Sequence, residues 1–595
     1  MKKKLLSLVL AVVMASSLVA CGGGGKSSGK VVTVDFMYGG DVALTEMYNL
    51  AIQEFNNTVG KEKNVNVAGI PKSGSLNTVL AQQLPNNGGP DVIALADDYF
   101  KKYTPYLDDM TGKIEQSVID EFYDNTVSRY YYDTETTTSN SDDPLYGVPS
   151  YNDTTVLYYN KTALEENGVI CISVDEEDLA AFNEGSAKDL NGKTKADYGI
   201  TSDVPAKGFY RSETPFVPYE GENDGLSWTS PSDEEELIFN DRIAMNWDEI
   251  EDLGMLCTKE WNDSSATKYG YYTEWWFNYG WSVGGDCLED LSGNGDWTFA
   301  LPGTNPNYIV GEGKTYTGVY TGTTYNAGET LDVKDIVNAN QGENISYDTD
   351  GKTYFNYTVN GSVASMRDFS AEVTNGTLVE LPSIKEAFSR FCYLAGIGGL
   401  NVCPYPDAFN GTTAVQYFTS GSLALLVEKV SNFKTIEKIM KDEWGVAPLP
   451  QYKVYTDPAD PLCDTVAKAG KVATHSLGYS ISVSAKSEVK DAAYIFVNWF
   501  ATEGQKFLAE NGYMSSRKSD AELALEKLPY SNAQIVLDSI KNSSAGDWWY
   551  MPDSTWITTW SNPLNKEVRY GKMELETFLY SYIEDSNARL AEYKQ

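Results

Sequence analysis

The sequence predicts an α/β protein. Between residues 31 and 96, three apolar strand-like runs alternate with two stretches of helical periodicity, the rhythm of a parallel sheet covered by helices. Residues 424–512 repeat this α/β character, and residues 285–380 alternate over short runs rich in Gly, Asn, Thr and Tyr, which predicts a β-rich insertion. A chain of 595 residues is too long for one hydrophobic core and predicts two or more domains.

The first block predicts five elements in order. Apolar residues alternate along the first strand, Val65 and Val67 mark the second, and an apolar run opens the third; in the first helix apolar residues recur every three to four positions. Gly60 is a plausible end for the first helix, and Pro85 ends the second. We expect strands over 31–38, 65–67 and 90–95, and helices over 44–55 and 76–84.

The second block predicts three strands and a helix. The helix begins after Ser487, carries a stripe of apolar residues through Phe500, and is capped at Asn511-Gly512. The expected strands cover 424–428, 444–450 and 479–483.

The first residues predict export. Lys2, Lys3 and Lys4 precede a short apolar run, and Leu18–Cys21 leads into a Gly/Ser/Lys tether. The run is too short to span a bilayer but suits a signal peptide. Small residues ending at a cysteine resemble a bacterial lipobox, so we expect removal of residues 1–20, lipidation of Cys21, a tether over 21–30, and a body anchored outside the cell membrane. The alternative is an ordinary cleaved signal with a chance cysteine.

Charge excludes some partners. The chain carries 84 Asp and Glu against 46 Lys and Arg, a net charge of −38. Nucleic acid binding needs cations that neutralise phosphate, so no nucleic acid partner is expected. Contact with anionic lipid beyond the anchor is disfavoured for the same reason.

Cysteine and histidine limit metal and catalytic chemistry. Besides Cys21 there are six cysteines without a CxxC pair, which makes a cysteine zinc site unfavourable. His475 is the only histidine, and its setting favours a structural or exposed residue over a catalytic one. Asp290 to Asp296 resembles the start of a calcium loop, but Leu301 stands where a glutamate is needed. We expect no cofactor, no metal and no enzymatic activity.

Aromatic residues make up 13% of the chain, and tyrosine dominates with 41 residues. Tyr and Trp join a flat apolar face to a polar tip, which suits partly wet surfaces that bind sugars. Composition alone does not separate this role from core packing.

Four segments in a fixed order carry a resemblance. They are Gly88–Ile93 ("G-x-PDV"), Tyr146–Pro149 running through Val156–Lys161 ("YG(I/V)P" into "LYYNK"), Phe418–Leu425 ("F-x-x-G-x-x-A-M"), and Gly478-Tyr479 with Ser487 and the helix through Trp499-Phe500. Together, behind a lipobox, they resemble the family 1 extracellular solute-binding lipoproteins of ABC transporters, which include maltose-binding protein. The resemblance covers most of residues 31–161 and 408–517. The middle of the chain is longer than the usual pattern of this family.

The resemblance implies a two-lobe fold of the periplasmic-binding-protein type (class II-like) with hinge crossings. The N-lobe would comprise 31–151 plus 408–487, and the C-lobe 152–407 plus 488–595, including the insertion at 285–380. An oligosaccharide would bind in the cleft between the lobes of a monomer and pass to ABC permease subunits.

The candidate ligand-binding residues lie near strand ends, in the crossing segments and in aromatic stretches. Each has a plain alternative, such as a helix cap for Asp41 or core packing for the tryptophans. Asp98 aligns with the family better than Asp97, and Trp548, Trp549 and Trp560 are further aromatic candidates. The selected residues are Asp41, Asp98, Tyr151, Asn152, Asp153, Trp275, Trp276, Tyr479 and Trp556.

Two alternatives remain open. A lipid-anchored glycoside hydrolase could work with carboxylates alone. The same fold could instead bind a non-sugar solute such as a polyamine or peptide. Few basic residues near the expected cleft argue against anionic ligands.

Overall fold

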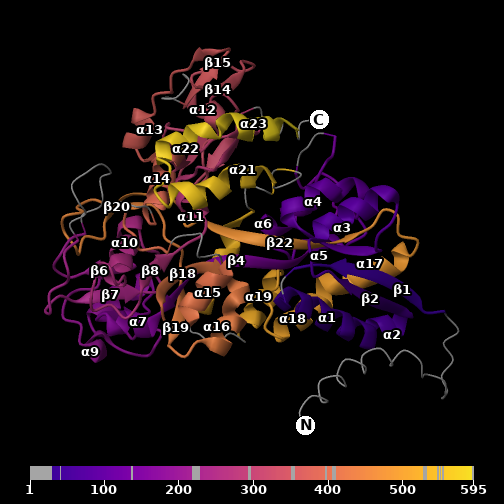
Figure 1. Ribbon diagram of the computed structural model, residues 1–595, viewed down its shortest axis with the longest axis horizontal. Helices are drawn as coiled ribbons and strands as arrows, with labels where there is room; N and C mark the ends of the chain where they lie inside the picture. Colours follow the sequence, from indigo (N-terminus) through magenta and orange to yellow (C-terminus); the bar gives the residue numbers. More distant parts are fainter. Residues whose placement is uncertain are drawn as a thin grey trace, which may run out of the picture.

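The computed structural model describes residues 30–40, 42–135, 139–216, 228–291, 297–349, 355–395, 399–404, 411–526, 532–545, 549, 551 and 555–592. Helices cover the strands of one long sheet, which confirms the predicted α/β class (Figure 1). The signal segment with Cys21, the tether up to residue 29, and Asp41 lie outside the described residues.

The first lobe is built on three parallel strands. β1 (Val32–Tyr38) lies between β2 (Val65–Pro71) and β3 (Val92–Ala96), and it is parallel to both. Apolar side chains of β1 and α1 form its core. The helices of this lobe are α1 (Val42–Asn57), α2 (Val59–Lys63), α3 (Leu76–Gln83), α4 (Asp97–Tyr103), α5 (Gln116–Ile119), α6 (Asp124–Val127), α17 (Lys490–Trp499), α18 (Gln505–Glu510) and α19 (Lys518–Leu525).

Two antiparallel strands join the lobes. β4 (Val148–Asn160) and β22 (Thr474–Val483) pair with each other, and the end of β22 also pairs with β3. The second half of β4 lies between β18 (Leu423–Lys429) and β19 (Trp444–Ala447). The sheet therefore runs without interruption from β2 to β8 (Tyr269–Tyr272), and β4 belongs to both lobes.

The expected division of the chain is wrong in its later part. β18 and β19 pair with the second half of β4, so residues 411–447 lie in the second lobe, not in the first. Conversely, α17 packs on β1, where the Phe496 and Phe36 rings lie 5.4 Å apart, so this helix belongs to the first lobe. Strand pairing partners decide lobe membership, and sequence order does not reveal them.

The second lobe has a smaller three-stranded sheet, β5-β7-β6, and several helices. Its strands are β5 (Val169–Ile172), β6 (Phe209–Arg211) and β7 (Leu237–Asn240), and its helices are α7 (Lys161–Glu166), α8 (Leu179–Asn183), α9 (Lys195–Tyr198), α10 (Trp247–Leu256), α11 (Phe277–Gly280), α14 (Ile384–Tyr393), α15 (Gly411–Thr419), α16 (Phe433–Ile439), α21 (Thr555–Pro563), α22 (Leu575–Ser581) and α23 (Ile583–Glu592). β20 (Lys453–Tyr455) and β21 (Val466–Ala469) form a hairpin, and α20 (Ala533–Lys541) with β23 (Ser543–Ser544) lies against β22.

Residues 285–380 form short antiparallel strands beside α23, and β14 and β15 project at the top of the view in Figure 1. Three strand pairs are present in the described part of this region: β9 (Leu288–Asp290) with β10 (Trp297–Phe299), β11 (Asn307–Val310) with β17 (Leu378–Leu381), and β12 (Thr315–Thr317) with β13 (Thr324–Asn326). A three-stranded sheet consists of β14 (Ile345–Thr349), β15 (Phe355–Val359) and β16 (Ser362–Val363). The short helices α12 (Val333–Ile336) and α13 (Ser370–Thr374) belong to the same region. Across the described ranges, no helix has the length and apolar character needed to cross a membrane.

Candidate functional site: a cleft between the lobes

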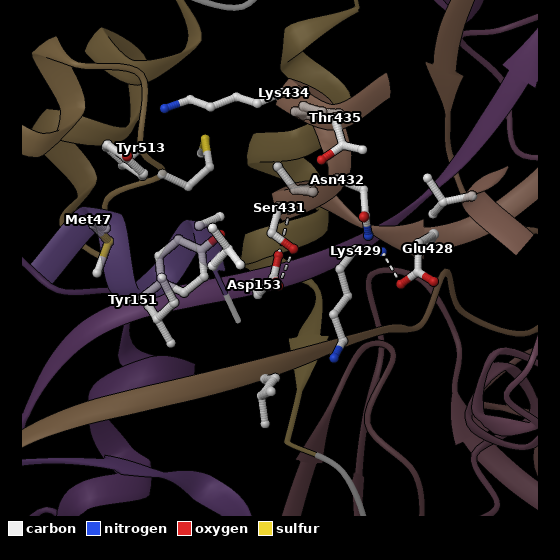
Figure 2. A pocket seen from close by; sticks show the side chains of 18 of the residues that line it. Met47, Tyr151, Asp153, Glu428, Lys429, Ser431, Asn432, Lys434, Thr435 and Tyr513 are labelled. Atoms are coloured by element: carbon white, nitrogen blue, oxygen red, sulfur yellow. Dashed lines mark hydrogen bonds between the residues drawn. The ribbon is translucent and has the colours of Figure 1, made fainter. Parts of the chain in front are cut away.

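A cleft of about 700 Å³ lies between the two lobes (Figure 2). One wall comes from the first turns of α1 and from residues 512–514, after α18. The other wall comes from α15, the end of β18 and α16, and the floor comes from β4 and β22. The start of α1 follows the carboxyl end of β1, the edge of a parallel sheet where ligands commonly bind.

Asp153 links the floor to the second lobe. Its carboxylate accepts a hydrogen bond from the Ser431 backbone N–H at 2.9 Å and another from the Ser431 hydroxyl at 2.7 Å (Figure 2). Ser431 belongs to η7 (Val430–Asn432), the turn between β18 and α16. These charge-assisted bonds fix the position of the turn beside the cleft.

Two tyrosines form an aromatic part of the floor. Tyr151 of β4 and Tyr479 of β22 are direct partners in the antiparallel register, so their side chains lie on the same face of the sheet. Burial raises the pKa of Tyr479 well above its usual value, and its neighbours, including Asp98 and Asp153, raise it further. Asp98 therefore lies close to the cleft floor, although it does not line the cleft.

Lys429 and Glu428 stand at the end of β18 and point in different directions (Figure 2). Glu428 accepts the backbone N–H of Lys429 at 2.9 Å, and burial raises the pKa of its carboxyl group. The side chain of Lys429 extends toward β22. Burial holds the pKa of His475 well below 6.5, and the positive charges of Lys429 and Arg129 lower it further.

Lys434 extends from α16 across the cleft toward the first lobe (Figure 2). Its Nζ lies 3.6 Å from the centre of the Tyr513 ring, and donates to the Asn511 carbonyl at 3.4 Å. This cation–π contact joins the two lobes at the edge of the cleft, with a stabilisation of about 0.5–1 kcal/mol at an exposed position.

Asn152 and Asp97 do not line the cleft. Asn152 lies between two cleft residues on β4, so strand alternation turns it to the opposite face, where it donates to the Thr126 hydroxyl at 2.9 Å. Asp97 is buried in an ion pair with Arg129 at 2.8 Å and accepts the backbone N–H of Gly478 at 2.9 Å. A Cβ at position 478 would lie 2.5 Å from the Asp97 carboxylate, which explains the glycine.

The tryptophans expected in the cleft lie elsewhere. Trp276, Trp556 and Trp560 are buried in one aromatic cluster, with ring centres 4.7 Å apart for Trp276–Trp560 and 6.4 Å apart for Trp556–Trp560. Trp275 is half-buried against the same core and does not line the cleft. The expectation that Trp276 or Trp556 stacks on a ligand is therefore wrong for this arrangement, in which core packing holds them.

Asp41, Trp548 and the calcium-like residues 292–296 lie outside the described residues. Within the described ranges, no cluster of three His, Cys, Asp or Glu residues has the arrangement to hold a metal ion. His475 is buried against Phe277, with ring centres 5.1 Å apart, as a structural histidine would be.

The cleft residues that were not expected from the sequence include Lys429, Ser431 and Lys434. They follow directly after the segment that resembles "F-x-x-G-x-x-A-M", which ends in β18. Ligands commonly bind where strands end at the edge of such a sheet. The position of these residues just after a strand was therefore the sequence feature from which they could have been predicted.

Comparison with known proteins agrees with this geometry. Residues 43–204 match the family of bacterial extracellular solute-binding proteins, and no curated protein matches the chain. The fold is shared with the cyclic α-maltosyl-1,6-maltose binding protein of Arthrobacter globiformis, at 14% identity and a TM-score of 0.54, with 95% of this chain and 100% of that chain covered. It is shared with maltose-bound MalE3 of T. maritima, at 14% identity and a TM-score of 0.53, with 94% of this chain and 99% of that chain covered. It is also shared with the ABC substrate-binding protein Lmo0181 of Listeria monocytogenes in complex with cycloalternan, at 13% identity and a TM-score of 0.51, with 94% of this chain and 98% of that chain covered.

Proposed function

We propose that this chain, which matches the bacterial extracellular solute-binding proteins over residues 43–204, is the substrate-binding component of an ABC importer. It captures an oligosaccharide in the cleft between its lobes and delivers it to permease subunits in the membrane. We also propose that it acts as a monomer outside the cell, held at the membrane by a lipid on Cys21.

The cleft itself carries the proposal. Both of its walls end on β4 and β22, the strands that connect the lobes, so a ligand that touches both walls favours closure about these strands. Closure gives a shape that depends on the ligand, which a permease can recognise. A solute carrier needs this coupling between capture and shape.

The composition of the cleft supports a saccharide. Tyr151, Tyr479 and Tyr513 offer flat apolar faces, and Asp153, Asn432 and Thr435 offer polar groups around them. Sugars have apolar C–H faces and hydroxyl rims, which match this mixture. A polyamine is disfavoured because its ammonium groups would meet Lys429 and Lys434.

A thermal-shift screen against an oligosaccharide panel tests the proposal. A ligand bound only by the native state raises the melting temperature by an amount that grows with its concentration above Kd. We expect at least one oligosaccharide to raise the Tm, and Asp153→Ala to reduce the shift. If polyamines or peptides raise the Tm and no saccharide does, the carbohydrate assignment fails.

The hydrolase alternative has a separate test. Among the described residues that line the cleft, two carry carboxyl groups, Asp153 and Glu428; Asp153 is held by Ser431, and Glu428 points away from it. We expect the purified protein to bind an oligosaccharide without releasing new reducing ends. Hydrolysis at enzyme-like rates that Glu428→Gln abolishes would favour a glycosidase.

A further inference from the structure

Lys429 is a half-buried cation that makes no direct ion pair with any described residue, although Glu428 lies close enough for the charge of Lys429 to lower its pKa. Within the described part of the chain, no ion pair or hydrogen bond involves its Nζ, although it lines the cleft. An ammonium group withdrawn from water without a partner is costly, and buried charges are normally paired. In a chain with 84 acidic residues, an unpaired lysine at a ligand site points to a partner supplied by the ligand.

The two carboxyl groups among the described cleft residues make hydrogen bonds to other groups. Asp153 accepts two hydrogen bonds from Ser431, both of which would have to break for it to turn toward Lys429. Glu428 accepts the backbone N–H of Lys429 rather than its ammonium; burial raises the pKa of the Glu428 carboxyl group, and the charge of Lys429 opposes this rise. His475 is held neutral, because burial and two nearby cations oppose its protonation.

The remaining charge on the second-lobe wall is also positive. Lys434 starts from the same wall, one turn of chain after Ser431, and its direct contacts are the Tyr513 ring and the Asn511 carbonyl, while Glu46 lies near enough to raise its pKa against the effect of burial. Lys429 and Lys434 thus both line the cleft, whereas Asp153 and Glu428, its described carboxylates, accept hydrogen bonds from backbone and hydroxyl donors.

From this arrangement we infer that the saccharide bound in the cleft is acidic, with a carboxylate that pairs with Lys429. The inference rests on the proposed function and specifies its ligand as a uronic-acid-containing oligosaccharide. The expectation against anionic ligands assumed few basic residues near the cleft. We replace it with this inference because Lys429 and Lys434 line the cleft.

The overall charge of −38 does not oppose this pairing strongly. Charges farther apart than about 8 Å are largely screened at physiological ionic strength. A direct contact between carboxylate and ammonium in a partly dry cleft is screened much less. Long-range repulsion would slow association rather than prevent a bound pair.

Matched pairs of ligands provide the test. Oligogalacturonates and oligoglucuronates of two to four residues are compared with their carboxyl methyl esters by isothermal titration calorimetry at two salt concentrations. Each pair differs in charge and keeps the same ring and linkage. We expect the acid of at least one pair to bind about tenfold or more tightly than its ester, with the difference decreasing at high salt.

Variants locate the contact. Lys429→Met should reduce the affinity for the acid about tenfold and leave the ester unchanged, and Lys429→Arg should retain most of the preference. Lys438→Met is the control, because Lys438 is an exposed lysine on α16 that does not line the cleft. It removes the same charge and should have no effect.

Three results overturn the inference. Esters or neutral oligosaccharides that bind as tightly as the acids would show that the ligand needs no charge, and the proposed transport function would stand. Equal loss of affinity for acid and ester in Lys429→Met would assign the lysine to sugar hydroxyls. If neither acidic nor neutral oligosaccharides bind, both the inference and the proposed function fail.

Discussion

Two buried carboxylates near the crossing strands, Asp97 and Asp153, have partners of different kinds. Asp97 meets the guanidinium of Arg129 and the backbone of Gly478, so it holds the end of β3 against η3 (Ser128–Tyr130) and β22. Asp153 accepts hydrogen bonds from the backbone and the hydroxyl of Ser431, and it lines the cleft. We assign Asp97 a structural role and propose Asp153 as a ligand contact.

We therefore expect Asp153→Ala to weaken oligosaccharide binding. Loss of hydrogen bonds to a charged group costs about 1.5–3 kcal/mol, which corresponds to a Kd raised by about tenfold or more. Calorimetry with the ligand found in the thermal screen measures this change. Asp153→Asn keeps the volume and one acceptor, and should have a smaller effect.

An Asp153→Ala protein that melts normally and binds with unchanged affinity would remove Asp153 from the site. Ser431→Ala is a useful companion variant, since it removes the hydroxyl and keeps the backbone donor.

Trp556 should affect stability rather than binding. Its side chain is fully buried, and truncation of a large buried aromatic residue costs about 3–5 kcal/mol. We expect Trp556→Ala to lower the midpoint of urea denaturation strongly, Trp556→Phe to lower it less, and both to retain ligand affinity under native conditions. Lost affinity in a stably folded Trp556→Phe protein would instead place this residue at the ligand.

Residue roles could be predicted from the sequence only in part. Asp153 and Tyr479, which line the cleft, could be selected because they stand in segments with a family pattern, and their contact with a ligand stays a prediction. Trp276 and Trp556 were not distinguished from ligand-stacking residues, because burial depends on neighbours distant in the chain, such as Trp560 for Trp276. Asn152 differs from its neighbours only by strand alternation, which requires knowing which face meets the cleft.

The order of the elements was more predictable than their partners. Periodicity gave β1, α1, β2, α3 and β3 with small errors at their ends, since local patterns determine these elements. The pairing of β18 with the second half of β4, and the packing of α17 on β1, depend on contacts across more than 250 residues. Such contacts leave no local signal, which explains the error in the lobe boundaries.

The β9 strand and the β14–β15 hairpin enclose a carboxyl group that should make stability depend on pH. Glu289 accepts hydrogen bonds from the hydroxyl groups of Tyr347 and Tyr357, and burial raises its pKa to about 8. In the unfolded chain the group titrates near 4.5. The folded state therefore holds the extra proton between about pH 4.5 and 8.

Since the folded state binds more protons in this range, stability should fall as pH rises from about 4.5 to 8, by up to about 1.4 kcal/mol per pH unit. Glu289→Gln keeps the acceptor oxygen and cannot ionise, so its stability should depend less on pH. Urea denaturation of both proteins at pH 5 and pH 8 measures the difference. Parallel pH profiles for the two proteins would mean that Glu289 does not titrate in this window.

At the scale of the whole molecule, the proposed anchor determines where the cleft operates. If Cys21 carries the lipid, Cys21→Ala should move the protein from the membrane fraction to the medium, or leave the signal segment uncleaved. Fractionation with immunoblotting distinguishes these forms by location and size. A fully processed Cys21→Ala protein that stays with the membrane would exclude lipid attachment through this residue.

The pairing of β3 with β22 has a consequence for how the chain assembles. β3 ends at residue 96 and its neighbour β22 begins at residue 474, so the sheet of the first lobe cannot be completed until the strand encoded near the far end of the chain is present. Until then β3 keeps an unpaired apolar edge, and such edges promote association between chains. Pairing across so long a separation is also slow. Truncation before residue 474 should therefore give an aggregating fragment and not an independent amino-terminal domain.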